Sequence, residues 1–358
     1  MKVGILGAGN WGTTLAMLVA NTHAPVQIWC RNEAIQDEIN TQHTNRRYVP
    51  GVLPSAIHAS TDLLQVVASS DLLFVVLPTS IFRNIAFEVG KVLKGDQIVV
   101  SASKGMEVGR GNAPGSKTMS DVFQEETCCK KIGVLSGPNI ALDILRGDPS
   151  GTVIASHYEE VIDQVISILQ QPKFKVYASR DLKGVEIAGA LKNTIAIAAG
   201  IAHGLGLQQN AKAFLLTRGI AEMSRLGQFL GAQPETFYGM AGIGDLIATC
   251  FSENSRNNRF GRALAAGKKP KDIFDEIQMV VEGVHTTSAV YELSQKFNIF
   301  MPITQAMYRI LYENALPQEE IKTLMQARIK YEGEERDLRY SDQTHALIHK
   351  YPIPEYLL

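Results

Sequence analysis

The chain has 358 residues, of which 45% are hydrophobic and 20% are charged, with 30 glycines and 14 prolines. This composition is typical of a globular protein with a sizeable core, and it excludes disordered, collagen-like and small disulfide-rich proteins. The formal net charge is -1, so we expect no general electrostatic attraction to nucleic acid or to an anionic membrane. At about 150 residues per domain, the length predicts two or three domains.

The cysteine pattern predicts reduced thiols and no metal site. The four residues are Cys30, Cys128, Cys129 and Cys250, with no C-x-x-C pair and no histidine at metal-ligand spacing. Glycines after Leu6 interrupt any signal-like apolar stretch, and no run comes near the roughly 20 apolar residues of a membrane span. We therefore expect a cytoplasmic protein with no membrane insertion and no nucleic-acid partner.

The first half of the chain alternates strand-like runs with helical patterns. The apolar strand-like runs are 2–6, 26–30, 72–76, 97–100, 132–135, 152–155 and 173–177. The helical patterns between them include 15–20, 61–68, 81–93 and 159–169. This alternation predicts βαβ units on a mostly parallel sheet that is covered on both faces. We expect an α/β domain over residues 1–178.

The second half has helical patterns only. They lie at 184–202, 211–230, 245–251, 255–266, 286–296 and 303–313, and glycine followed by proline marks two of the helix ends. These patterns predict an all-α domain over residues 179–334. The end of the chain, 335–358, is charged and tyrosine-rich with weak periodicity, and we treat it as an extension of unknown role.

A glycine-rich motif directly follows the first strand-like run. The segment Gly7-Ala8-Gly9-Asn10-Trp11-Gly12 has the pattern G-x-G-x-x-G and precedes a helical pattern. The first glycine permits a tight turn, the second lets the backbone approach a pyrophosphate, and the third lets helix and strand pack closely. The diphosphate then lies on free N–H groups at the helix N-terminus. The strand before and the helix after predict a Rossmann-type dinucleotide site.

Arg31 follows the second strand-like run, about 20 residues after the glycine motif, where NAD-binding folds usually carry an acidic residue. An arginine there can stack on adenine and pair with the 2'-phosphate of NADP. Glu33 is close enough to leave NAD open, and a solvated loop arginine is a further alternative. The expected cofactor is therefore NADP or NAD.

Lys192 lies on a helical pattern where its neighbours three and four residues away are small or apolar, namely Ala188, Gly189, Ile195 and Ala196. No carboxylate lies on its own helical face, and small neighbours let another element approach. Burial in such a groove lowers the pKa of a lysine toward neutrality, which makes the amine a usable general acid or base. A lysine that reaches solvent is the alternative. The residues alone leave both open.

Asp245 follows a glycine-rich turn and precedes an apolar helical pattern. It can act as an N-cap, or it can orient a lysine or a substrate hydroxyl. The next helix start combines a hydroxyl, a guanidinium and an amide in Ser255, Arg256 and Asn257. With free N–H groups and the helix dipole, these predict a phosphate monoester site; a solvated or nucleic-acid-facing edge is the alternative.

Two loops are expected at the carboxyl edge of the sheet, where ligands of open α/β folds bind. Lys104 follows the run 97–100, and Ser136 to Asn139 follow the run 132–135. We expect both loops to flank the nicotinamide end of a bound dinucleotide.

Together and in this order, these segments resemble the bacterial NAD(P)-dependent glycerol-3-phosphate dehydrogenases. The motifs are Gly7–Gly12, Ser103-Lys104-Gly105, Leu135-Ser136-Gly137-Pro138, Ala190-Leu191-Lys192-Asn193, Gly242-Ile243-Gly244-Asp245-Leu246, Ser255-Arg256-Asn257 and Val281-Glu282-Gly283. The resemblance covers about residues 1–334. It implies reversible reduction of dihydroxyacetone phosphate to sn-glycerol 3-phosphate, a phospholipid precursor, by a homodimer that needs no metal.

The resemblance also implies residue roles. Lys192 would donate a proton to the carbonyl oxygen, and Lys104 would hold and polarise the substrate. Further active-site positions are Asn193, Asp245 and Thr249. The substrate would be bound by Lys104, Gly137, Asn139, Lys192, Asp245, Ser255, Arg256 and Asn257. The cofactor would be bound by Gly7, Gly9, Asn10, Trp11, Gly12, Arg31, Lys104, Ala141, Arg256, Val280 and Glu282. Asn10 and Asn139 depart from the small hydroxyl residues that this family often has there.

Two other functions stay open at this point. One is a related reductase of another small acid, and the other is a regulator that binds NAD(P) without turnover. A regulator without turnover would not explain the presence of Lys104, Lys192 and the Ser255 to Asn257 cluster.

Overall fold

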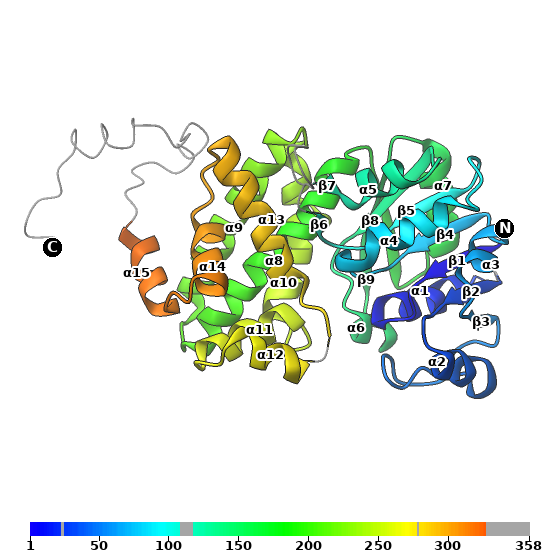
Figure 1. The fold of residues 1–358 in the computed structure, drawn as a ribbon, viewed down its shortest axis with the longest axis horizontal. Coiled ribbons are helices and arrows are strands. Elements are labelled where there is room, and N and C mark those ends of the chain that lie inside the picture. Colours follow the sequence, from blue (N-terminus) through cyan, green and yellow to red (C-terminus); the bar gives the residue numbers. More distant parts are fainter. Residues whose placement is uncertain (23–24, 108–116, 278, 327–358) are drawn as a thin grey trace, which may run out of the picture.

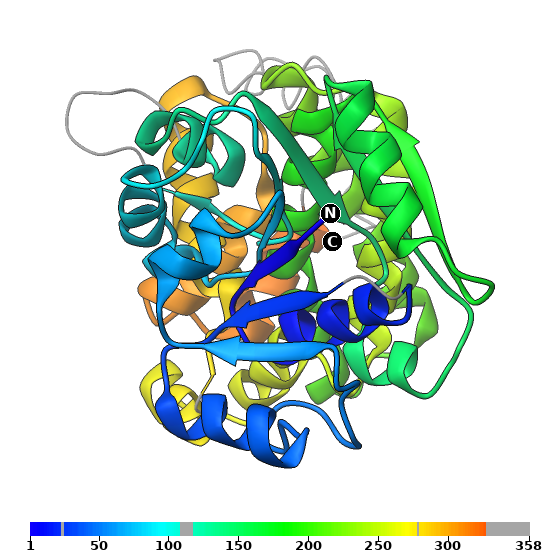
Figure 2. The same cartoon turned by 90° about the vertical axis from the view of Figure 1, so that its right-hand side faces the viewer.

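The structure is a computed structural model that describes residues 1–22, 25–107, 117–277 and 279–326. A part with a central sheet, formed by the first half of the chain, lies beside a helical part formed by the second half (Figure 1). The view in Figure 2 places the sheet part in front of the helical part. The predicted fold class, a Rossmann-type mostly parallel sheet followed by a helical part, is confirmed. The extension 335–358 lies outside the described residues.

The main sheet has eight strands in the order β10-β9-β8-β5-β4-β1-β2-β3. They are β1 (Val3–Leu6), β2 (Val26–Trp29), β3 (Ile57–Ser60), β4 (Leu72–Val75), β5 (Ile98–Ser101), β8 (Lys131–Ser136), β9 (Ser150–Ser156) and β10 (Phe174–Ser179). Neighbours pair in parallel except β8 and β9, which are antiparallel. Every residue of β1, β4 and β5 is buried because their runs are continuously apolar.

The strand order reverses between β1 and β4, which both pair with their neighbours in parallel. In open α/β sheets a ligand binds outside the carboxyl ends of the strands at such a reversal. The glycine motif follows β1, so the fold places it at this point.

Helices and short elements complete the sheet part. They are α1 (Asn10–Ala20), α2 (Glu33–Asp37), the π-type turn η1 (Glu38–Gln42), α3 (Leu63–Ala68), α4 (Thr79–Gly90), β6 (Met106–Glu107), β7 (Lys117–Thr118), α5 (Met119–Glu126), α6 (Ala141–Leu145) and α7 (Glu159–Leu169). The strand β3 was not predicted, because its four residues put His58 in solvent between buried Ile57 and Ala59. β6 and β7 have two residues each, too few to give a pattern.

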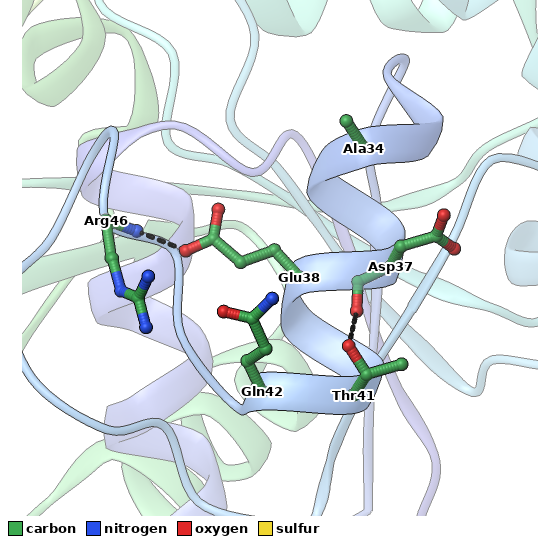
Figure 3. A pocket seen from close by; sticks show the side chains of 6 residues that line it. All are labelled: Ala34, Asp37, Glu38, Thr41, Gln42 and Arg46. Carbon is green, nitrogen blue, oxygen red and sulfur yellow. Dashed lines mark hydrogen bonds between the residues drawn. The ribbon is translucent and has the colours of Figure 1, made fainter.

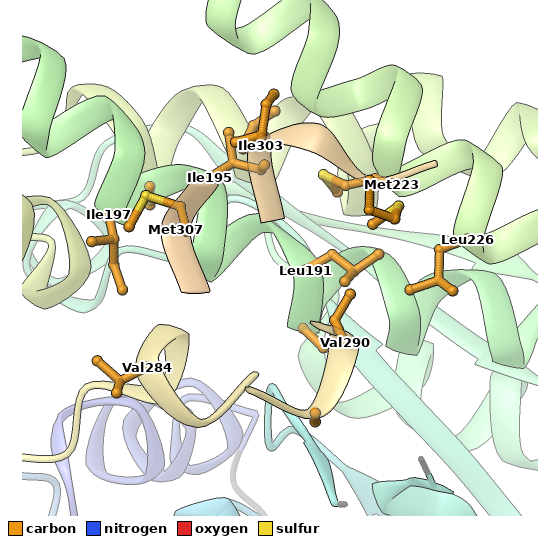
Figure 4. Packing of buried hydrophobic residues seen from close by; sticks show 14 of the residues in the cluster. Leu191, Ile195, Ile197, Met223, Leu226, Val284, Val290, Ile303 and Met307 are labelled. Carbon is orange, nitrogen blue, oxygen red and sulfur yellow. The ribbon is translucent and has the colours of Figure 1, made fainter. Parts of the chain in front are cut away.

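The helical part packs around one long helix. Its elements are α8 (Leu182–Gly204), α9 (Gln209–Phe229), η2 (Pro234–Tyr238), η3 (Met240–Gly244), α10 (Asp245–Phe251), α11 (Arg256–Ala265), α12 (Pro270–Ile277), α13 (Glu282–Phe297), α14 (Pro302–Tyr312) and α15 (Pro317–Gln326). Leu191 and Ile195 of α8 lie in a buried cluster with Met223 of α9, Val290 of α13 and Met307 of α14 (Figure 4).

α8 corrects one expectation. By length and composition it is apolar enough to span a membrane, so the prediction that no run comes near a span was wrong for this segment. However, 94% of its most apolar stretch is buried inside the protein. A helix that is covered on all sides is apolar all round for that reason.

Glycines bring α8 and α11 into backbone contact. A Cβ on Gly200 of α8 would lie 2.1 Å from the carbonyl oxygen of Asn258, and a Cβ on Gly261 of α11 would lie 2.0 Å from that of Ile197. Neither position tolerates a side chain at this separation. The helix that carries Lys192 and the helix that begins at Arg256 are thereby held together.

Candidate active site

The three glycines of the first turn have different surroundings. Gly7 has a φ of +121°, and a Cβ there would lie 2.4 Å from the carbonyl oxygen of Val76. A Cβ on Gly12 would lie 1.9 Å from the carbonyl oxygen of Gly7, so α1 packs directly onto the end of β1. At Gly9, no atom of the described residues lies within 4 Å of an added Cβ. This open space is what the approach of a pyrophosphate to the backbone requires.

One asparagine lies in this turn, and a second one binds it from outside. Within the described residues, the buried Oδ1 of Asn10 has no hydrogen-bond partner, which leaves an acceptor for a ligand. Asn45, which is fully buried, donates through Nδ2 to the Ala8 carbonyl at 3.0 Å and to the Thr13 hydroxyl at 2.9 Å. Sequence analysis missed Asn45, because no motif marks a residue that supports the turn from 37 positions away. The turn is thus preformed, and its groups fit a dinucleotide.

The other cofactor candidates lie around the turn. Trp11 is half-buried on α1, and Ala141 begins α6, which packs against α1. Arg31 is exposed just beyond β2, and the exposed Glu33 begins α2. Because both follow the same strand end, the structure keeps NAD and NADP open.

Lys104, Lys192 and Asp245 form one buried charge cluster. Asp245 of α10, whose side chain is 2% exposed, accepts from Lys104 Nζ through Oδ2 at 2.6 Å and pairs with Lys192 Nζ through Oδ1. Lys192 also donates to Thr249 Oγ1 at 2.6 Å, and Lys104 donates to the Gly137 carbonyl at 3.1 Å. A loop of the sheet part and two helices therefore bring two amines to one carboxylate.

Burial changes the acid strength of Lys192. Desolvation lowers its pKa most, the Asp245 carboxylate opposes this effect, and the Lys104 ammonium adds to it, so that the net pKa is about 8. The direction agrees with the expectation for a lysine in a groove of small residues, and the alternative of a lysine that reaches solvent is wrong. At neutral pH the amine is close enough to its pKa to give or take a proton.

The role of Asp245 as an N-cap is not observed. η3 continues directly into α10, Gly244 occupies the cap position, and no side chain caps this helix. The carboxylate binds the two lysines instead, which is the alternative that the sequence left open. Lys192 has its partner on another helix, where sequence spacing gives no signal.

A chain of amides connects the charge cluster to α11. Asn257 donates through Nδ2 to Asn193 Oδ1 at 2.9 Å, and Asn193 donates through Nδ2 to the Lys104 carbonyl at 3.4 Å. Asn257 Oδ1 also accepts from the Gly283 N–H at 3.0 Å. Asn193 and Asn257 are thus positioned by each other, beside Lys192.

The start of α11 is as predicted. Ser255 is the N-cap, and its hydroxyl accepts from the Asn258 N–H at 3.2 Å. The next residue, Arg256, is exposed and donates to the Val280 carbonyl at 2.8 Å. The exposed guanidinium at the positive end of a helix is suited to an anion.

Gly137 and Asn139 differ in what they leave free. The Gly137 carbonyl faces the Lys104 ammonium. The Asn139 side chain is bonded at both ends, donating to the Gly151 carbonyl at 3.0 Å and accepting from Thr152 Oγ1 at 3.0 Å. Its observed role is to hold this loop against β9.

The linings of two surface hollows do not include Lys104, Lys192 or Asp245. One of about 380 Å³ opens over α2 and η1 beside Asp37, Glu38 and Arg46 (Figure 3). Another of about 110 Å³ lies near Cys250, His203 and Phe251. Among the described residues, no group of three or more His, Cys, Asp or Glu side chains could hold a metal.

Two family profiles match most of the chain. Residues 2–162 match the N-terminus of NAD-dependent glycerol-3-phosphate dehydrogenase, and residues 181–322 match its C-terminus. The chain is 41% identical to glycerol-3-phosphate dehydrogenase (NAD(P)+) of Bacillus cytotoxicus, over 93% of this chain and 97% of that protein. It is 43% identical to the enzyme of the same name from Leuconostoc mesenteroides, over 92% and 99%.

Solved structures give the same result. Glycerol-3-phosphate dehydrogenase from Coxiella burnetii superposes with a TM-score of 0.86 at 34% identity, over 91% of this chain and 99% of that one. The enzyme of Plasmodium falciparum superposes with a TM-score of 0.84 at 26% identity, over 92% and 97%.

Proposed function

Because the chain belongs to the NAD-dependent glycerol-3-phosphate dehydrogenase family, we propose that it reversibly reduces dihydroxyacetone phosphate to sn-glycerol 3-phosphate for phospholipid synthesis. The observation that carries this proposal is the buried Asp245 carboxylate between the ammonium groups of Lys104 and Lys192. Family membership favours this activity over a reductase of another small acid and over a nucleotide sensor without turnover.

The proposed chemistry needs a proton donor at the substrate carbonyl. The cofactor would supply the hydride in its reduced form, NADPH or NADH, and would accept the hydride in its oxidised form, NADP or NAD. A ketone that gains hydride develops an oxyanion, which a neighbouring ammonium stabilises and then protonates. Lys192, with its pKa near 8, gives that proton, and its neutral amine takes the proton back in the reverse direction.

Asp245, Thr249 and Lys104 support this amine. Asp245 and Thr249 hold Lys192 Nζ in place by two hydrogen bonds. The side chain of Lys104 is 19% exposed, so its ammonium is the more accessible of the two and is suited to the substrate oxygens. Asn193, the residue after Lys192 on α8, donates to the Lys104 carbonyl and so links α8 to the Lys104 backbone.

The phosphate of the substrate is assigned to Ser255, Arg256 and Asn257. First-turn N–H groups and the positive helix end attract a dianion, and a guanidinium can bind two of its oxygens. Gly137 and Asn139 are assigned to the substrate side of the site.

The cofactor is assigned to the glycine turn, Trp11, Arg31, Ala141, Val280 and Glu282, with Lys104 and Arg256 at its reactive end. The open space at Gly9 and the unpaired Asn10 Oδ1 support this assignment. Arg31 favours NADP, and Glu33 keeps NAD possible.

The test follows the absorbance of reduced cofactor with dihydroxyacetone phosphate, using NADH and NADPH in parallel. We expect substrate-dependent oxidation, and the ratio of kcat/KM for the two cofactors gives the preference. Cofactor binding without oxidation would contradict the proposal in favour of a sensor. Oxidation with an unphosphorylated keto acid alone would favour another reductase.

The proposal includes a cytoplasmic homodimer and a division of the chain into domains 1–178 and 179–334. Apolar side chains four residues apart, Ile243, Ile247 and Phe251, are 37%, 44% and 53% exposed. Such a row is suited to cover by a second subunit. Light scattering of the purified protein at the mass of one chain would contradict the dimer.

A further inference from the structure

The carboxylate of Glu282 reaches from the helical part to the sheet part. Glu282 is the first residue of α13, and its Oε1 accepts from the Thr79 backbone N–H at 3.1 Å. Its Oε2 accepts from the Thr79 hydroxyl. The two residues are 203 positions apart in the chain, so this link joins the two parts of the molecule directly.

Thr79 begins α4, and the start of this helix lacks a cap of its own. Pro78 occupies the cap position without a side-chain hydrogen bond, and the first turn of α4 has no acidic residue. First-turn N–H groups have no partner within their helix, and a negative charge is favoured there. Glu282 supplies both the acceptor and the negative charge to the start of α4, from 203 positions later in the chain.

The link lies between the glycine turn and the Lys104 loop. Val76, just before it, donates to the Leu6 carbonyl at 2.9 Å. On the other side, a Cβ on Gly105 would lie 2.3 Å from Thr79 Cγ2 and 3.3 Å from Glu282 Oε2. The residue after Lys104 therefore packs directly on the Thr79–Glu282 pair.

The segment that carries Glu282 is also fastened to α11. Arg256 donates to the Val280 carbonyl at 2.8 Å, and Asn257 accepts from the Gly283 N–H at 3.0 Å. Residues 280–283 are thus held by the assigned phosphate residues on one side and by Thr79 on the other.

We propose that Thr79 is a positioning residue for cofactor binding. It holds the Glu282 carboxylate so that residues 280–283 keep a fixed place relative to the glycine turn and Lys104. Each carboxylate oxygen retains acceptor capacity for a donor on the cofactor, such as a carboxamide N–H or a ribose hydroxyl. This inference rests on the proposed function, in which Glu282 contacts the cofactor.

The test uses Thr79→Val, which removes the hydroxyl and keeps the N–H, with Thr79→Ser as the conservative variant. The dissociation constants of NADH and NADPH are measured by fluorescence without substrate, and kcat and KM are measured separately. We expect Thr79→Val to raise the better cofactor's Kd about tenfold, the loss of one charge-assisted hydrogen bond, with little change in kcat. Thr79→Ser should restore Kd to within about twofold of the unmodified protein, since the hydroxyl returns.

A double variant separates positioning from simple stability. In a Glu282→Gln background, Thr79→Val should weaken cofactor binding less than it does alone, because the two changes remove one interaction. Thr217→Val is the matched control, since Thr217 is exposed and bonds only within α9. An unchanged Kd in Thr79→Val, with or without a lower Tm, would overturn the inference, as would additive effects in the double variant.

Different results of these experiments would contradict the proposed function and the role of Thr79. A protein that binds NADH or NADPH but does not reduce dihydroxyacetone phosphate contradicts the proposed function, while the Kd comparison still tests Thr79. Full turnover with no effect of Thr79→Val on Kd overturns Thr79 alone.

Discussion

The glycine turn and the lysine cluster are built in opposite ways. The turn uses consecutive residues that follow β1 and continue into the first residues of α1, and it offers mainly backbone and open space. The cluster uses side chains from a loop of the sheet part, from α8 and from α10, and Lys104 and Asp245 are 141 positions apart. In the proposed function, binding of the cofactor's diphosphate thus depends on local geometry, whereas the proton chemistry depends on how the two parts meet. Substitutions in the two regions should therefore have different signatures.

The largest effect is expected for Lys192→Ala. It removes the proposed proton donor, so kcat should fall about 10²- to 10⁴-fold. The Kd of the reduced cofactor should stay nearly unchanged, because the glycine turn is untouched. Steady-state kinetics and fluorescence titration measure the two values, with Lys322→Ala on exposed α15 as control. Turnover at the normal rate would remove Lys192 from this role.

Asp245→Asn should lower kcat about 100-fold, because two ammonium groups lose their shared counter-charge. It should also shift the pH profile. The carboxylate raises the Lys192 pKa against burial, so its loss moves that pKa below about 8. Reduction needs protonated Lys192, and its rate should fall as pH rises through about 8 in the unmodified protein.

In Asp245→Asn that fall should begin at lower pH, and the rise of the oxidation rate should move in the same direction. Rate profiles for both directions measure this shift. Asp272→Asn, an exposed position of α12, is the control. Profiles that coincide with those of the unmodified protein would show that Lys192 does not control the pH dependence.

Arg256→Ala should raise the KM for dihydroxyacetone phosphate about 10- to 100-fold, the contribution of a bidentate charged contact. Its Tm should change little, since the side chain is exposed. Arg259 lies one turn further along the same helix face and is also exposed. Arg259→Ala therefore tests whether the KM depends on the position of Arg256 or only on the positive charge of the helix. Equal KM values for the two variants would favour a diffuse charge effect.

The smallest effect is expected for Gly9→Ala. The added Cβ meets no atom within 4 Å in the part of the chain that the structure describes, so folding should be unaffected. The methyl group occupies the space assigned to the pyrophosphate, and the cofactor Kd should rise about tenfold. Gly12→Ala provides the contrast, because its Cβ would lie 1.9 Å from the Gly7 carbonyl oxygen and should lower the Tm. Tighter or equal binding in Gly9→Ala would place the diphosphate elsewhere.

The parts of the fold that sequence predicts well are those with long regular patterns. The strand runs around residues 3–6 and 72–75 and the helix around 184–202 were expected, and the structure confirms them with shifts of a few residues at their ends. β3 and the pair β6 and β7 were missed, because a short edge strand or a two-residue strand has no periodicity to detect. The antiparallel pairing of β9 depends on partners and not on its own residues.

The candidate site divides in the same way. The glycine motif can be recognised in the sequence because its residues are adjacent and each glycine meets a specific steric requirement. The sequence left open that Asp245 orients a lysine but did not identify Lys192 as its partner, since 53 positions separate them and only the packing of α8 against α10 brings them together. Asn45 and Thr79 gave no signal at all, because each acts on a backbone or carboxylate that is remote in sequence.

The contact between α8 and α11 sets a spacing that side-chain motion cannot adjust. Gly200 and Gly261 put the two backbones against each other, with Lys192 on one helix and Arg256 at the head of the other. In the proposed function, this contact therefore fixes the distance between the backbone position of the proton donor and that of the phosphate-binding arginine. A side chain at either glycine would increase this distance only by pushing the two helices apart.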